Sequence, residues 1–268
     1  MLRQSGLRSG LRPSAMKLTS QGLTDPGCVR TENQDRILFD DALGLYIVCD
    51  GMGGHRRGDL AAELASNSLS QYVEASRDPK EVTWPYGYNL QISFAANRLL
   101  TAAKLANRHV WRRSEEAIQY IGMGTTIAAA LFEDRTAAIV NIGDSRVYLW
   151  RAGQLEQLSV DDSVMGPVPP VGSTGIAGQP LLRGVLTRAA GSQENADLHV
   201  TECHLEDGDI LLLSSDGLHG VVAEDRIRSL LAGAAGSVND AATSLIAAAR
   251  GAGASDNISA VVIEYRNQ

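Results

Sequence analysis

Hydrophobic and polar positions along this chain predict many short strands and a few helices. Residues 45–49 are all apolar, which is typical of a strand buried on both faces. Further runs of strand type, bounded by turn residues, cover residues 17–23, 37–39, 125–132, 137–142, 147–150, 155–158, 199–205, 210–215 and 258–265. Helical spacing of apolar residues is found over residues 60–73, 99–110, 224–231 and 239–249. We therefore expect strands that turn back on one another, with helices between groups of strands.

Two segments show neither pattern. Residues 159–180 lack periodicity and are rich in Pro and Gly, which indicates a surface flap of a length that is usually functional or mobile. The first fifteen residues contain Arg3, Arg8 and Arg12 but no acid, which weakly resembles an organellar transit peptide. A flexible tail, or a true start at Met16, explains the same composition. We expect residues 1–16 to be a flexible extension and residues 17–268 to be a single domain, because no repeat or long linker interrupts them.

Composition limits the class of protein. The chain has 268 residues, of which 44% are hydrophobic, enough for one large domain with a substantial core. Its net charge of −7 counts against a nucleic-acid binder. No apolar run approaches the roughly 20 residues of a membrane span. Cys28, Cys49 and Cys203 form no CxxC pair and are odd in number, so we expect reduced, packed cysteines and a cytoplasmic protein.

Four acids stand at the ends of predicted strands. Asp50, Asp144 and Asp216 each follow an apolar strand, and Asp256 precedes one. Neighbouring antiparallel strands run in opposite directions, so an acid after one strand and an acid before its neighbour lie at the same edge. If these strands are adjacent, four carboxylates converge, and their mutual repulsion calls for a cation.

Each acid also has a purely structural explanation. Asp before Gly is a common turn pair, so Asp50 or Asp216 alone would be read as a turn residue, and Asp144 or Asp256 as the cap of a bend. The four together favour a site for Mg²⁺ or Mn²⁺, which prefer oxygen ligands. The chain offers no Cys or His cluster for zinc.

Arg30 is the candidate for binding a phosphate. Two metals bridged by a carboxylate lower the pKa of water, and such centres usually attack a phosphoryl group. A phosphate substrate also requires a cation that grips two of its oxygens, which is typical arginine chemistry. Arg30 stands in a polar segment before Asp35, which could hold metal-bound water. A solvated charge pair between Arg30 and Glu32 is an equally good reading of the spacing alone.

Seven ordered motifs resemble the bacterial metal-dependent Ser/Thr protein phosphatases of the 2C type, also called the PPM family. They span nearly the whole chain from about residue 17, which makes the resemblance highly specific. The motifs are Arg30 with Asn33-Gln34-Asp35; Val48-Cys49-Asp50-Gly51-Met52-Gly53-Gly54-His55; Gly122-Met123-Gly124-Thr125-Thr126; Ile142-Gly143-Asp144-Ser145-Arg146; Leu186-Thr187-Arg188-Ala189-Ala190-Gly191; Leu213-Ser214-Ser215-Asp216-Gly217-Leu218; and Ser255-Asp256-Asn257-Ile258-Ser259.

The resemblance implies an α+β fold, a four-layer α-β-β-α sandwich of two central antiparallel sheets flanked by helices. It implies two Mn²⁺ or Mg²⁺ ions at one edge of the sandwich, and a weaker third. By position, Asp50 would bridge the two ions and Gly51 would add its carbonyl to the second. The other implied metal ligands are Asp216 and Asp256 at the first ion, Asp35 through waters of the second, and Asp144 beside Asp216 at the third.

The resemblance also implies the reaction and its partners. Phosphoserine or phosphothreonine in proteins would be hydrolysed by a water that bridges the ions, with Asp50 and Asp216 as catalytic residues and Arg30 on the phosphate. The substrates would be targets of a bacterial Ser/Thr kinase, or the kinase itself, and the enzyme a monomer that binds neither nucleic acid nor membrane. A pseudophosphatase and a two-metal phosphodiesterase are the rival hypotheses.

Three positions depart from the family pattern. Gln34 replaces a common Glu, which removes one negative charge near the second ion. Met52 follows Asp-Gly where eukaryotic members have a His, and His55 lies nearby either as a contact of the leaving group or as an ordinary surface residue. Asp162 stands where the family often has His, and we assign it no role. We expect the flap to select substrates because the region is variable in the family and lies beside the active site.

Overall fold

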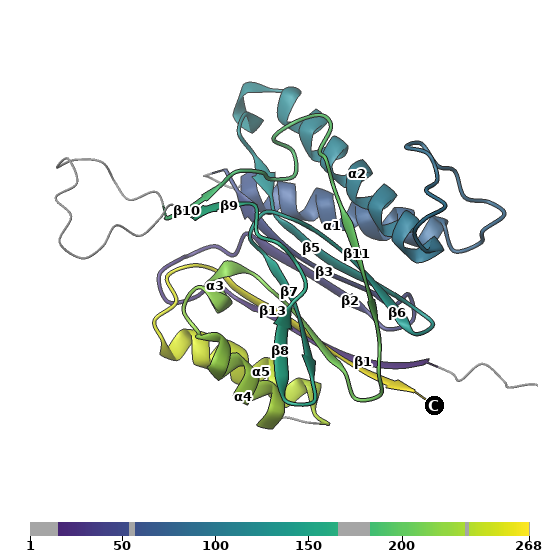
Figure 1. Ribbon diagram of the computed structural model, residues 1–268. Helices are drawn as coiled ribbons and strands as arrows, with labels where there is room; N and C mark the ends of the chain where they lie inside the picture. Colours follow the sequence, from purple (N-terminus) through teal and green to yellow (C-terminus); the bar gives the residue numbers. More distant parts are fainter. Residues whose placement is uncertain (1–15, 54–56, 166–182, 234–235, 268) are drawn as a thin grey trace, which may run out of the picture.

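The protein folds into four layers, with helices outside and two sheets between them (Figure 1). The computed structural model describes residues 16–53, 57–165, 183–233 and 236–267. All strand pairs in these residues are antiparallel. The predicted α-β-β-α sandwich is therefore confirmed. Residues 1–15 lie outside the described part, so the flexible extension and the single-domain boundary stay predictions.

One sheet carries the two ends of the described chain side by side. Its order is β1 (Met16–Asp25), β13 (Ile258–Asn267), β12 (Ile210–Ser214), β7 (Arg146–Arg151) and β8 (Gln154–Gln157). Its outer face is covered by α3 (Asp216–His219), α4 (Glu224–Gly233) and α5 (Val238–Gly251).

The other sheet has the order β11 (Val200–His204), β6 (Thr136–Ile142), β5 (Ile127–Glu133), β3 (Leu45–Met52) and β2 (Asp35–Asp40). The short β4 (Gly124–Thr125) pairs with the end of β3. The outer face of this sheet is covered by α1 (Arg57–Ala75) and α2 (Phe94–Glu115). The 3-10 turn η1 (Ile118–Tyr120) follows α2. A separate hairpin joins β9 (Ser163–Met165) to β10 (Arg183–Leu186).

Three apolar cores fill the spaces between the four layers. The strand β3 is continuously apolar because it lies between two of these cores. Leu45, Ile47 and Cys49 point to α1 and α2, whereas Tyr46 and Val48 point to the opposite sheet. All five are fully buried. Side chains alternate across a strand, so a strand with packing on both faces needs an apolar residue at every position.

Most predicted elements are present, with a few corrections. The run 125–132 is split at Thr126 into β4 and β5, and the four-residue α3 was not predicted. Cys49 is buried as expected, but Cys28 is exposed because it lies in a turn, so the prediction that all three cysteines are packed was wrong. Residues 166–180 of the predicted flap, and His55, lie outside the described residues.

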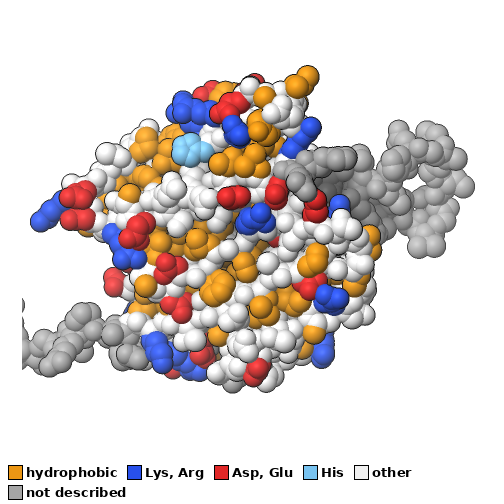
Figure 2. Space-filling model, turned by 180° about the vertical axis from the view of Figure 1, so that it is seen from behind, with side chains coloured by type: hydrophobic (Ala, Val, Ile, Leu, Met, Phe, Trp, Pro, Cys, Tyr) orange, Lys and Arg blue, Asp and Glu red, His pale blue; other side chains and the backbone are white. Residues whose placement is uncertain are grey.

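The surface charge of the described chain is mixed. Figure 2 shows Lys and Arg side chains interspersed with Asp and Glu on the face opposite to that of Figure 1. Within the described residues, no helix is both long and apolar enough to cross a bilayer.

Candidate active site

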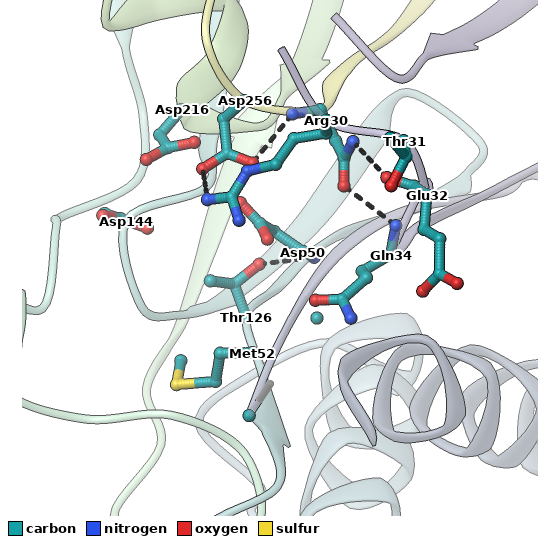
Figure 3. A pocket seen from close by; sticks show the side chains of 13 residues that line it. Arg30, Thr31, Glu32, Gln34, Asp50, Met52, Thr126, Asp144, Asp216 and Asp256 are labelled. Carbon is teal, nitrogen blue, oxygen red and sulfur yellow. Dashed lines mark hydrogen bonds and ion pairs between the residues drawn. The ribbon is translucent and has the colours of Figure 1, made fainter. Parts of the chain in front are cut away.

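A polar cavity of about 580 Å³ opens at one edge of the sandwich (Figure 3). It is lined by Arg30, Thr31, Glu32, Gln34, Asp50, Gly51, Met52, Gly53, Thr126, Asp144, Asp216, Asp256 and Asn257. The four acids at predicted strand ends are all among these residues, as is Arg30. The edge therefore gathers the side chains that the sequence pattern singled out.

The four acids come from both sheets. Asp50 lies near the end of β3 in one sheet, whereas Asp216 and Asp256 flank β12 and β13 in the other. Asp144 lies in the turn between β6 and β7, where the chain crosses from one sheet to the other. The convergence is as predicted, but it occurs across the two sheets.

The backbone around Asp50 is fixed by threonines of the neighbouring strand. The Asp50 N–H donates to Thr126 Oγ1 at 2.9 Å, and its carbonyl accepts from the Thr125 hydroxyl at 2.9 Å and the Thr126 N–H at 2.8 Å. Gly51 then packs so closely on the start of α1 that an added Cβ would lie 2.0 Å from the Gly58 carbonyl oxygen. Only glycine fits there, so the turn after Asp50 has little freedom.

Asp35 lies behind the cavity. It pairs with Asp50 in the β2–β3 register and is 2% exposed. Its Oδ2 accepts hydrogen bonds from Ser215 Oγ at 2.8 Å and Ser259 Oγ at 2.6 Å, while Oδ1 is buried without a hydrogen-bond partner. Burial, only partly offset by the two serines, raises the pKa of Asp35 to about 6.

The surroundings of Asp50, Asp144 and Asp216 also disfavour negative charge. Burial and the nearby Asp35 raise the pKa of Asp50, and burial and Asp256 raise the pKa of Asp216. Burial and Asp216 raise the pKa of Asp144 to about 6. Carboxylates this close repel one another, and bound cations would relieve that repulsion.

Arg30 occupies the mouth of the cavity. Its guanidinium Nη2 donates to Asp256 Oδ2 at 2.9 Å, and its side chain is 57% exposed. Asn257 holds the segment that carries Arg30: its Nδ2 donates to the carbonyls of Pro26 at 3.2 Å and Glu32 at 2.9 Å, and its Oδ1 accepts from the Gln34 N–H at 2.9 Å. Arg30 is thus accessible, and the backbone that carries it is anchored to the start of β13.

The donors in the cavity fit hard divalent cations. They are carboxylate and carbonyl oxygens, and Asp216 Oδ1 is buried without a hydrogen-bond partner. Among the described residues, no three Asp, Glu, His or Cys side chains are already arranged around one ion position. Mg²⁺ commonly uses only one or two protein carboxylates and keeps several waters, so the residues present remain compatible with it.

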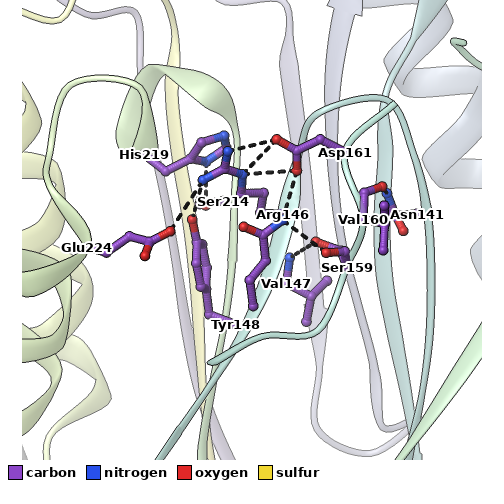
Figure 4. Close-up of polar contacts among 11 residues, drawn as sticks. Asn141, Arg146, Val147, Tyr148, Ser159, Val160, Asp161, Ser214, His219 and Glu224 are labelled. Atoms are coloured by element: carbon purple, nitrogen blue, oxygen red, sulfur yellow. Dashed lines mark hydrogen bonds and ion pairs between the residues drawn. The ribbon is translucent and has the colours of Figure 1, made fainter. Parts of the chain in front are cut away.

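A partly buried polar cluster surrounds Arg146 (Figure 4). Arg146 Nε lies 3.0 Å from both carboxylate oxygens of Asp161, and its Nη1 donates to the Tyr148 hydroxyl at 2.8 Å. His219 Nδ1 lies 3.0 Å from Ser214 Oγ, and the ring also interacts with the backbone of Asp144. The cluster therefore ties the turn of Asp144 to α3, which begins with Asp216.

Asp162 connects the same turn to the far side of the flap. Its Oδ2 accepts from the Gly143 N–H at 3.2 Å, and its Oδ1 accepts from Arg188 Nε at 3.0 Å. The Asp162 carbonyl also accepts from the Thr187 N–H at 2.8 Å. We assigned Asp162 no role from the sequence; in the structure it joins both ends of the segment 163–186 to the residue before Asp144.

Sequence reasoning missed some of the residues that shape the site. Thr126 and Asn257 had been noted only as parts of motifs, and their polar side chains next to candidate acids were the available signal. Arg146 is likewise only part of a motif, whereas His219 belongs to no motif and gave no comparable signal. Asp35 was expected near the second ion; it lies beneath the cavity wall, and its role stays a prediction.

Comparisons with known proteins identify the family. The sequence profile described as Protein phosphatase 2C matches residues 29–247. The serine/threonine phosphatase stp of Listeria monocytogenes serotype 4b is 31% identical over 250 residues, which cover 90% of this chain and 93% of the relative. The chain therefore belongs to the protein phosphatase 2C family.

Solved structures agree with this assignment. The PPM Ser-Thr phosphatase MsPP from Mycobacterium smegmatis, in complex with cacodylate, is 32% identical with a TM-score of 0.73, and the match covers 93% of this chain and 99% of that one. The catalytic domain of the phosphatase PstP, in complex with two manganese ions, is 28% identical with a TM-score of 0.78, covering 94% and 100%. The resemblance seen in the motifs is confirmed, and the protein is a metal-dependent Ser/Thr protein phosphatase.

Proposed function

We propose that the chain hydrolyses phosphoserine and phosphothreonine of proteins in the cavity that contains Asp50 and Arg30. The observation that carries this proposal is the gathering of four carboxylates beside the exposed guanidinium of Arg30. Two Mn²⁺ or Mg²⁺ ions and a weaker third would be held by Asp35, Asp50, Gly51, Asp144, Asp216 and Asp256. Such ions lower the pKa of water and offset the charge of a phosphoryl group. Asp50 and Asp216 are the acids on which turnover depends most.

Arg30 orients the substrate in this proposal. Its guanidinium can exchange the single bond to Asp256 for two parallel bonds to phosphate oxygens. The arginine is available for this exchange because it is more than half exposed. The anchored backbone between Pro26 and Gln34 keeps the guanidinium at the mouth of the cavity, so the phosphate is presented to the acids in one orientation.

The partners and location follow from the reaction and the composition. Phosphoserine and phosphothreonine are made by protein kinases, so the substrates are products of a Ser/Thr kinase in the same cell, or the kinase itself. We propose that the active form is a monomer. The cysteines of the described residues are free, which suits the reducing cytoplasm.

Replacing the two central acids tests the site. We expect D50N and D216N to lower kcat for a phosphothreonine peptide by more than about a hundredfold, since even supporting partners of metal ligands are worth about 10- to 100-fold. Both variants should also bind Mn²⁺ more weakly, measured by calorimetry. The control is D225N, at an exposed position on α4. Wild-type turnover and Mn²⁺ affinity in D50N and D216N would refute the assignment.

The same assay separates the rival functions. A pseudophosphatase would hydrolyse neither the peptide nor p-nitrophenyl phosphate in the presence of Mn²⁺. A phosphodiesterase would prefer bis-p-nitrophenyl phosphate to the monoester. We expect turnover of the monoester and the peptide, and loss of both after treatment with a chelator.

A further inference from the structure

A second cavity, of about 260 Å³, lies next to the active-site cavity. Met52 lines both of them. Figure 3 shows the Met52 side chain on the far side of Thr126 from Arg30, at the end of the first cavity. The two cavities therefore adjoin each other at the Met52 side chain.

The wall of the second cavity is mixed, with apolar side chains on one part of it and polar groups on the rest. Met52, Trp111, Met123 and Ala189 contribute apolar side chains, and Ser114, Glu115 and Ser192 contribute polar ones. Glycines complete the lining, so backbone rather than side chains limits parts of the space. The four apolar side chains suit a hydrophobic side chain of a ligand, because burial of apolar surface is favourable and requires no polar partner.

The apolar character continues outside the cavity. Ile118 and Ile121, in and directly after η1, are 83% and 63% exposed. They come just before Gly122, which is itself part of the cavity wall. Large exposed hydrophobic residues next to a cavity with apolar side chains are typical of a surface that binds another molecule.

We infer that this second cavity is a subsite for the protein substrate, and that it takes a large aliphatic side chain near the phosphorylated residue. The inference rests on the proposed function, because it assumes that the phosphate of the same substrate lies beside Arg30. Two observations argue for this occupant: the cavity adjoins the active site through Met52, and Trp111, Met123 and Ala189 offer apolar contacts to an aliphatic chain. A hydrophobic pocket of this kind distinguishes side chains that differ by one or a few methylene groups by about 10- to 200-fold.

A peptide series on the wild-type enzyme tests the subsite. The peptides place one phosphothreonine among alanines, and a single Leu replaces each flanking Ala in turn. We expect one position at which Leu raises kcat/KM about tenfold. Lys at the same position should give no such gain. Equal kcat/KM for all Leu peptides would overturn the inference, and so would a preference for Lys, which would indicate recognition by the charge of Glu115.

A cavity-filling variant links the preference to this wall. Ser192 is exposed at the rim, and its Oγ donates to the Ala189 carbonyl at 2.8 Å. In S192F the aromatic ring should fill the cavity and remove the gain from Leu, measured as the kcat/KM ratio of the Leu peptide to p-nitrophenyl phosphate. S229F is the matched control, because Ser229 is exposed on α4 in the other helical layer.

The outcomes distinguish this inference from the proposed function. If neither peptides nor p-nitrophenyl phosphate are hydrolysed in the presence of Mn²⁺, both fail. If all substrates are hydrolysed but S192F retains the Leu preference, only the subsite is refuted. Loss of the preference in S192F together with its retention in S229F supports the subsite.

Discussion

Arg30 has one partner in the described structure and another during the proposed reaction. Its bond to Asp256 joins a half-exposed cation to a partly exposed carboxylate, so solvent screens the pair and its net contribution to stability is small. The energy required to release Arg30 is therefore low. A phosphate with two oxygens in reach would replace this partner readily.

R30K tests this role at the residue scale. We expect kcat/KM for a phosphopeptide to fall about 10- to 100-fold, because Lys keeps the charge but loses the planar, two-pronged donor. The free energy of unfolding should change little, since the Arg30–Asp256 pair is exposed. The matched control is R228K on α4, where Arg228 pairs with Asp225 at the surface. Unchanged kcat/KM in R30K would show that Arg30 does not bind the phosphate.

The strands and the residues at their ends could be predicted, because their signals are local. The apolar run before Asp50 and the one after Asp256 mark both a strand and its end in a few consecutive residues. The helix α3 gave no such signal, because four residues are too few to show a helical period. The contacts of Asp162 with Gly143 and Arg188 could not be found either, since they join residues that only the folded chain brings together.

His219, the last residue of α3, makes the stability of the protein depend on pH. Burial, followed by the charge of Arg146, lowers the pKa of His219 to about 3, against about 6.5 for an exposed histidine. Between these values the unfolded chain binds a proton that the folded protein does not. The free energy of unfolding therefore falls as pH falls through this window.

H219Q measures that contribution. Between about pH 4 and 6 the wild type should lose stability more steeply than H219Q, by about 1.4 kcal/mol per pH unit. Urea unfolding of the metal-free proteins at several pH values provides the comparison. H199Q is the control, because His199 is exposed. Parallel pH dependences of the wild type and H219Q would show that His219 is not held neutral.

Over the whole molecule, cations and protons compete for the same carboxylates. Asp35 and Asp144 have pKa values raised to about 6, so they are increasingly protonated below that pH. Metal binding needs the ionised carboxylates, so the affinity for the metal must decrease as the pH decreases. A ligand that binds only the folded state raises the free energy of unfolding by RT ln(1 + L/Kd), where L is the free ligand concentration.

Thermal unfolding makes this competition visible. We expect Mn²⁺ to raise Tm at pH 7.5 and to raise it clearly less at pH 5.5. At a concentration about 100 times Kd, the stabilisation should be about 2.7 kcal/mol. D216N should show a smaller rise at both pH values. An equal rise at both pH values in the wild type would mean that the bound Mn²⁺ is not held by these acids.

The inter-sheet core also acts as a spacer for the active site. Asp50 belongs to one sheet, and Asp216 and Asp256 belong to the other, so the side chains packed between the sheets set how far apart these acids stand. Val48 precedes Asp50 by two residues and Leu213 precedes Asp216 by three, and both lie in that core. The size of the apolar side chains between the sheets thus sets the distance between the carboxylates. Apolar residues that do not touch the substrate therefore help to determine the geometry of the metal site.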